Sequence, residues 1–90
     1  MSNTSVLEHD TAPGEEERIV QWLREYIGKV LEVPIDRIDA DASFQHLGLD
    51  SSAAVGMTGD LGDWLGREID AAAAYDYPTI QALARALSAS

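Results

Sequence analysis

Apolar residues recur at helical spacing along this chain, and that periodicity limits the possible folds more than any other feature. In the first such stretch the recurring positions are Ile19, Leu23, Ile27 and Val30 or Leu31. Acidic residues open the stretch at Glu15, and Glu25 precedes Lys29 by one turn, charges that suit a helix. Pro34 must end it, because the residue before a proline is forced out of helical geometry. We therefore expect a first helix from Glu15 that stops before Pro34.

Three more helices are expected downstream. Asp50 suits the N-cap position of a second helix that runs from Ser51 to about residue 65. Asp70 can cap a short helix over residues 71–74, and Thr79 can cap a last helix. The apolar face of that last helix consists of Ile80, Leu83, Ala84 and Leu87. Because no strand-like alternation or internal repeat competes, the predicted fold class is all-α with a short third helix.

Two segments lack helical periodicity. Residues 1–14 are polar and contain Pro13, so we expect a flexible N-terminal tail ahead of a single domain over residues 15–88. Residues 34–50 place a few apolar side chains among aspartates and alanines, which predicts a long loop between helices 1 and 2. At 90 residues the chain has room for one core only.

Charge and composition exclude several classes of function. Asp and Glu number 16 against 6 Lys and Arg, and the net charge of −10 disfavours nucleic acids and anionic membranes while favouring basic partners. The chain has no cysteine, so disulfides and thiolate sites are excluded. It has no bilayer-length apolar stretch and no signal-peptide pattern, so we expect a cytoplasmic location. No metal site is expected, because Asp36, Asp39 and Asp41 lack the glycine and glutamate of a calcium loop.

Ser51 is the candidate for covalent chemistry. A serine at the start of a helix is usually the N-cap, but here Asp50 is the better-placed cap, which leaves the Ser51 hydroxyl free to point outward. A phosphate ester on that hydroxyl would be stabilised by the positive end of the helix. A hydrolase that pairs Ser51 with His46 is the competing interpretation, but a minimal helical bundle offers little of the cleft that a catalytic triad requires. We therefore expect no enzymatic activity.

The segment around Ser51 resembles a known family. Residues 44–51, FQHLGLDS, are similar to the F-x-x-L-G-x-D-S motif of acyl carrier proteins. Residues 75–80, YDYPTI, followed by Leu83 and Ala84, resemble the segment that leads carriers of the polyketide-synthase type into their last helix. The resemblance extends over most of the predicted domain.

This resemblance implies a right-handed four-helix bundle of the acyl-carrier type. It also implies that a phosphopantetheinyl transferase moves 4′-phosphopantetheine from coenzyme A onto Ser51, so that the chain holds acyl or polyketide intermediates as thioesters. The implied partners are that transferase, an acyl-loading ligase or acyltransferase, and ketosynthase or condensation-type enzymes, all met by a monomeric carrier. Residues 58–67 are similar to those of carriers loaded by fatty acyl-AMP ligases.

Two other functions remain open. Peptidyl carrier proteins of nonribosomal peptide synthetases share the fold and the modified serine, although they typically have a second glycine where this chain has Leu49. An unmodified helical docking module is the other alternative, with the glycines of the second helix as its contact face. Those glycines are Gly56, Gly59 and Gly62. Each is costly inside a helix, which indicates either a close contact or a helix that tertiary packing stabilises despite them.

Partner contacts are expected on the helix that begins at Ser51. Ser52 stands where the family usually has leucine or isoleucine, and Gly56 and Gly59 stand where it commonly has acidic or bulky residues. Val55, one turn beyond Ser51, is either an apolar contact or a core residue. The full set of candidate contacts is Asp50, Ser52, Val55, Gly56, Gly59, Asp60 and Asp63.

Overall fold

The computed structural model describes residues 14–89, and within them every element of regular structure is a helix. The elements are α2 (Glu15–Leu31), η1 (Ile35–Arg37), α3 (Phe44–Leu47), α4 (Ser51–Leu65), α5 (Ala73–Asp76) and α6 (Ile80–Ala89). The predicted all-α class is confirmed, and α2, α4, α5 and α6 correspond to the four expected helices. The expected tail lies outside the described residues except for Gly14, which is the N-cap of α2.

The core lies between the three long helices. The apolar stripe of α2, formed by Ile19, Leu23 and Ile27, is fully buried, and α2 packs mainly against α6. The other buried apolar residues are Ile38, Phe44, Leu49, Met57, Leu61, Ala74, Ile80, Leu83 and Ala84. Burying one large aliphatic side chain contributes about 1.5–3 kcal/mol, so this cluster is the main source of stability.

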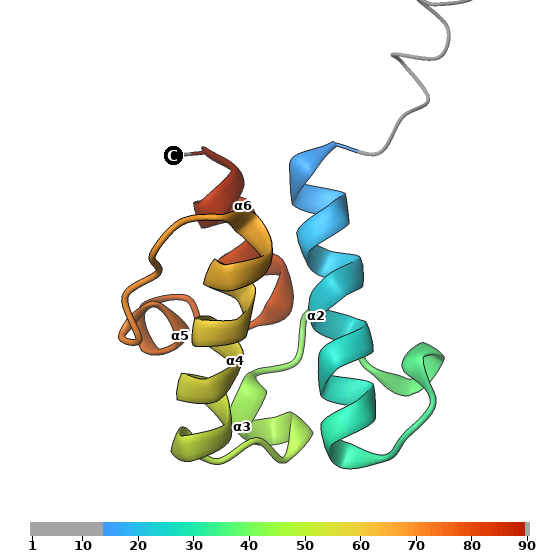
Figure 1. Cartoon of the computed structure of the whole chain (residues 1–90). Helices are drawn as coiled ribbons and strands as arrows, with labels where there is room; N and C mark the ends of the chain where they lie inside the picture. Colours follow the sequence, from blue (N-terminus) through green and yellow to red (C-terminus); the bar gives the residue numbers. More distant parts are fainter. Residues whose placement is uncertain (1–13, 90) are drawn as a thin grey trace, which may run out of the picture.

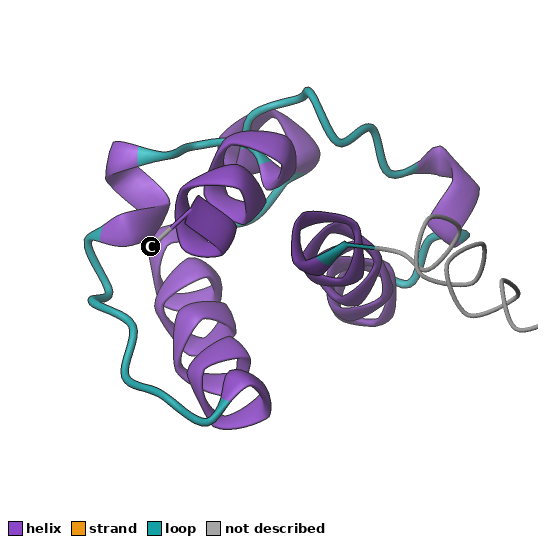
Figure 2. Ribbon diagram, turned by 90° about the horizontal axis from the view of Figure 1, so that it is seen from above, coloured by secondary structure: helices purple, strands orange, loops and turns teal. Residues whose placement is uncertain are grey.

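The helices surround this shared interior, with the connecting segments on the outside (Figure 2). α4 runs antiparallel to α2, so the start of α4 lies at the same end of the molecule as the end of α2 (Figure 1). As predicted, α2 ends before Pro34, where Glu32 adopts a left-handed conformation with φ of 60°. This arrangement places Ser51 at one end of the bundle.

The loop between α2 and α4 is more structured than predicted. It contains η1 and α3, both of which are too short to show an apolar period in the sequence. The amide of Phe44 donates to the Pro78 carbonyl at 2.8 Å, and the amide of Gln81 donates to the Ala40 carbonyl at 3.0 Å. These backbone bonds fasten the loop to the segment that leads into α6.

The short helix α5 lies two residues later than predicted. The carboxylate of Asp70 accepts a hydrogen bond from the Ala72 amide at 2.9 Å and closes a turn, so the prediction of a helix over residues 71–74 is wrong. The predicted cap at Thr79 is confirmed, since its hydroxyl accepts from the Ala82 amide at 3.0 Å.

The three glycines of α4 have different surroundings. A Cβ at Gly62 would lie 2.6 Å from the Arg67 carbonyl oxygen, because the chain turns back tightly against α4 at this point. A Cβ at Gly56 would approach only the Tyr26 hydroxyl, at 3.8 Å, and a Cβ at Gly59 would meet nothing within 4 Å. Close packing of the backbone therefore requires glycine at position 62 but not at position 59.

Alanine substitutions at Gly59 and Gly62 should have opposite effects on stability. Gly59→Ala stiffens an open helical position and should raise the free energy of unfolding by about 0.5–1 kcal/mol. Gly62→Ala pushes the Arg67 carbonyl away and should lower the free energy of unfolding by about 1–3 kcal/mol. Urea unfolding followed by circular dichroism measures both values. A loss of stability in both variants would contradict this account of Gly59.

Candidate functional site

The turn between α3 and α4 fixes the position of Ser51. α3 ends at Gly48, which has φ of 106°, a left-handed conformation that glycine adopts without strain. Leu49 is then only 6% exposed, and its amide donates to the Phe44 carbonyl at 3.0 Å. Because Phe44 and Leu49 are both held in the core, the backbone at the start of α4 is closely constrained.

Asp50 caps α4 and leaves Ser51 exposed. The Asp50 carboxylate accepts a hydrogen bond from the Ala53 amide at 2.9 Å, which confirms the predicted N-cap. Ser51 is the first residue of the helix and is exposed to solvent. An anionic group attached to its hydroxyl would lie at the positive end of the helix dipole. The first backbone N–H groups of a helix have no carbonyl acceptor within the helix, and they lie next to this position.

An apolar hollow of about 350 Å³ adjoins Ser51. Its walls come from both segments that resemble carrier proteins, which the backbone bond between Phe44 and Pro78 joins. The lining residues are Ser43, Phe44, Gln45, Leu49, Asp50, Ser51, Ala54, Ala74, Tyr75 and Pro78. Sequence reasoning missed Ala74 and Tyr75 as neighbours of Ser51, because only the fold brings α5 close to the start of α4.

The candidate contact residues of α4 follow one exposed strip of the helix. They are Ser52, Val55, Gly56, Gly59, Asp60 and Asp63, and we call them the outer face of α4. Val55 is 46% exposed, so it faces solvent and is not a core residue. Asp50, the remaining candidate, is exposed at the foot of this strip, although its carboxylate is already engaged as the N-cap.

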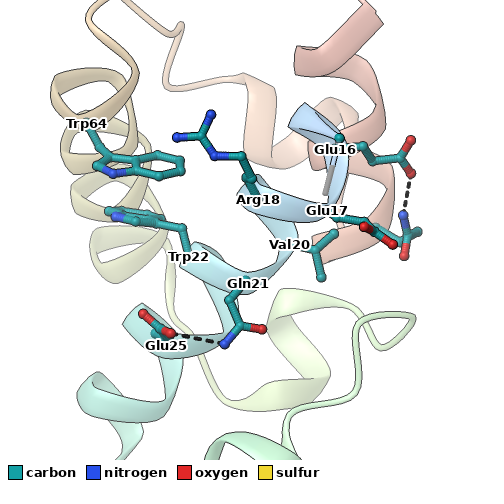
Figure 3. Close-up of a pocket in the computed structure, with 10 residues that line it drawn as sticks. Glu16, Glu17, Arg18, Val20, Gln21, Trp22, Glu25 and Trp64 are labelled. Atoms are coloured by element: carbon teal, nitrogen blue, oxygen red, sulfur yellow. Dashed lines mark hydrogen bonds between the residues drawn. The ribbon is translucent and has the colours of Figure 1, made fainter. Parts of the chain in front are cut away.

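A row of residues centred on three stacked aromatic rings joins α2 to α4 beside the outer face. It consists of Arg18, Trp22 and Tyr26 on α2 and Gly56, Asp60 and Trp64 on α4, and we call it the aromatic seam. The ring of Trp22 stacks on Tyr26 and on Trp64, with centroids 5.1 Å and 5.7 Å apart. Figure 3 shows the two stacked indoles with Arg18 beside them. Sequence reasoning missed this row, although each helix contributes its members at intervals of four residues.

Tyr26 and Asp60 extend the aromatic seam towards the start of α4. The Tyr26 hydroxyl lies next to Asp60. Burial raises the pKa of Tyr26 above its usual value of 10.0, and the neighbouring Asp60 carboxylate raises it further. One of the candidate partner contacts therefore lies beside a side chain of α2.

The described residues contain neither a metal cluster nor a membrane-spanning helix. Over residues 14–89, no group of three or more His, Cys, Asp or Glu side chains is placed to hold a metal ion. None of the helices in that part of the chain is both long and apolar enough to cross a bilayer. His46 is exposed on α3.

The sequence matches a described protein family over most of its length. Residues 21–87 match the family described as the phosphopantetheine attachment site. Among curated proteins, the chain is similar to the acyl carrier protein TtuC of Teredinibacter turnerae, at 42% identity over 73 residues, which are 81% of this chain and 84% of that protein.

Two further comparisons extend this similarity. A phenolphthiocerol/phthiocerol polyketide synthase protein of Mycobacterium tuberculosis is 37% identical over 68 residues, which are 76% of this chain but only 4% of that much longer protein. Among solved structures, a free-standing peptidyl carrier protein of Acinetobacter baumannii superposes with a TM-score of 0.78 and 35% sequence identity, over 83% of this chain and 94% of that chain.

The burial of Tyr26 and the nearness of Asp60 should make stability depend on pH in the alkaline range. Because folding raises the pKa of Tyr26, the neutral phenol stabilises the folded state, fully so below about pH 10, and this contribution is lost as the pH rises through the raised value. The free energy of unfolding should therefore fall more steeply above pH 10 in the wild type than in Tyr26→Phe. Urea titrations across this range measure the difference, with Tyr77→Phe as a control for loss of an exposed hydroxyl. Parallel curves for the wild type and Tyr26→Phe would refute the coupling.

Proposed function

Because this chain belongs to the phosphopantetheine-binding carrier proteins, which hold intermediates and catalyse no reaction themselves, we propose that it is an acyl carrier protein of the polyketide-synthase type. In this proposal the 4′-phosphopantetheine arm is attached to Ser51. The observation that carries the assignment is the exposed Ser51 at the first position of α4, directly after a residue that already serves as the N-cap.

The residues around Ser51 suit this group. Its phosphate would be joined to the Ser51 oxygen at the N-terminal end of α4, where backbone amides and the helix dipole stabilise negative charge. Leu49 and Tyr75 line an apolar hollow at the same place, which offers an uncharged surface to a flexible chain. When attached, the group supplies a terminal thiol that holds an acyl chain as a thioester. The residues of the chain present the serine and keep it accessible.

An acyl cargo is favoured over an aminoacyl cargo. Leu49 stands where peptidyl carriers typically have a second glycine, and its buried side chain anchors the turn before Ser51. Similarity to TtuC and to a segment of a polyketide synthase supports the same assignment. Similarity to a free-standing peptidyl carrier protein supports the alternative, a carrier of a nonribosomal peptide synthetase.

The proposed partners are enzymes that meet the Ser51 end in turn. They are a phosphopantetheinyl transferase, an acyl-loading enzyme such as a fatty acyl-AMP ligase or an acyltransferase, and a ketosynthase or condensation-type enzyme. A net charge of −10 favours rapid encounter with basic surfaces. Each of these complexes should be weak and should dissociate quickly, so that the carrier can leave one partner for the next.

The site of attachment can be tested by intact-mass spectrometry. After incubation with coenzyme A, magnesium and a broad-specificity phosphopantetheinyl transferase, the wild type should gain the mass of one phosphopantetheinyl group. Ser51→Ala should gain none, whereas Ser52→Ala, which removes the adjacent exposed hydroxyl, should gain the same mass as the wild type. An unchanged mass of the wild type with several competent transferases would favour an unmodified docking module, and modification of Ser51→Ala would exclude this site.

The class of cargo can be tested on the modified protein. Incubation of the holo form with ATP, a fatty acid and a fatty acyl-AMP ligase should give a carrier with one acyl group bound, and hydroxylamine should remove that group because it cleaves thioesters. The matched reaction replaces the fatty acid and its ligase with amino acids and adenylation domains. Loading of amino acids alone would support the peptidyl carrier instead.

A further inference from the structure

The aromatic seam leaves an aromatic surface exposed far from Ser51. Trp64 is 41% exposed although it stacks on Trp22, so the pair is not part of the closed core. Trp64 lies 13 residues after Ser51 on the same helix, which corresponds to a distance of roughly 20 Å along the axis. A partner that contacts this surface would therefore leave the Ser51 end free.

The surroundings of the exposed indole are acidic. Glu25 on α2 lines the same hollow as the two tryptophans and lies on the Trp22 side of that helix (Figure 3). The exposed Asp63 precedes Trp64 on α4. The Glu25 carboxylate also accepts a hydrogen bond from the Gln21 amide at 3.0 Å, which holds it on this side of α2. An exposed indole with carboxylates nearby attracts cations through both its ring face and the local charge.

The chain itself shows how a cation sits on this indole. The guanidinium carbon of Arg18 lies 5.6 Å from the centroid of the Trp64 ring, within the range of a cation–π contact. Arg18 lies on the exposed surface of α2, so solvent competes for it and its contact with the ring is weak. A second guanidinium that arrives with its own apolar neighbours can replace it on the ring.

We propose that the Trp64 end of the aromatic seam is a second docking surface, separate from the Ser51 end, for a partner protein that presents an arginine on a helix or an extended segment. The partner's guanidinium takes the position of Arg18 over Trp64, while the nearby Glu25 and Asp63 select against acidic segments. Arginine is favoured over lysine because its planar group stacks on an indole. This inference does not depend on the attachment of an arm to Ser51.

The surface can be probed with a synthetic alanine-based helical peptide that carries arginines along one face. In ¹⁵N-labelled protein, the indole N–H signals of Trp22 and Trp64 should shift on titration with this peptide, and should not shift with the same peptide carrying glutamates. Trp64→Gln should weaken binding by roughly three- to tenfold, the range expected for loss of one cation–π contact. Tyr77→Gln is the control for loss of an exposed aromatic ring, since Tyr77 is 43% exposed, and should bind as the wild type does.

Removal of Arg18 separates a specific contact from general attraction. Arg18→Gln vacates the ring and should tighten binding more than Arg37→Gln, which removes the same charge from the exposed surface of η1. Equal tightening in both variants would mean that only net charge matters and would overturn the proposal. So would peptide-induced shifts confined to acidic residues away from the two indoles, or the absence of any shift.

Two measurements guard against failure of the variants themselves. Circular dichroism melting shows whether Trp64→Gln is folded, and Trp64→Phe, which retains an aromatic face, should keep more affinity than Trp64→Gln. Modification of Ser51 by a transferase, measured by intact-mass spectrometry, tests the proposed function separately. A Trp64→Gln variant that is modified normally but still binds the peptide with full affinity would refute the docking surface alone.

Discussion

The hydrogen bond from the Phe44 amide to the Pro78 carbonyl joins the two halves of the molecule on which the site depends. It ties the start of α3 to the turn that precedes α6, and the bond from Gln81 to Ala40 strengthens the same junction. Phe44 and Ile80 are buried beside these bonds, so apolar packing supports the same junction. At the same end of the molecule α5 lies against α4, which gives Ser51 apolar neighbours from the second half of the chain.

Much of this arrangement could be predicted from the sequence where local rules are sufficient. The apolar stripe of α2 and the caps Asp50 and Thr79 are properties of short windows, and the structure confirms them. The helices η1 and α3 could not be predicted, because three or four residues are too few to display a period. The boundaries of α5 were wrong because Asp70 can close a turn as readily as it can cap a helix, and only its contacts decide between the two.

The aromatic seam illustrates a different limit. The spacing of its residues within each helix is visible in the sequence, but which turn of α2 faces which turn of α4 depends on how the helices are offset. Gly56 faces the Tyr26 hydroxyl, which lies next to Asp60 one turn along. An acidic residue that the sequence presents as a contact for partners thus lies beside a side chain of α2, and only the offset of the two helices determines that neighbour.

The stacked pair of indoles also has a spectroscopic consequence. The chain has two tryptophans, Trp22 and Trp64, and both lie in this one stack. Any ultraviolet emission that the protein gives on selective excitation of indole therefore originates at the contact between α2 and α4, on the opposite half of α4 from Ser51. Quenching or spectral shifts would register separation of these two helices, and would be blind to events at the serine unless those events move the helices apart.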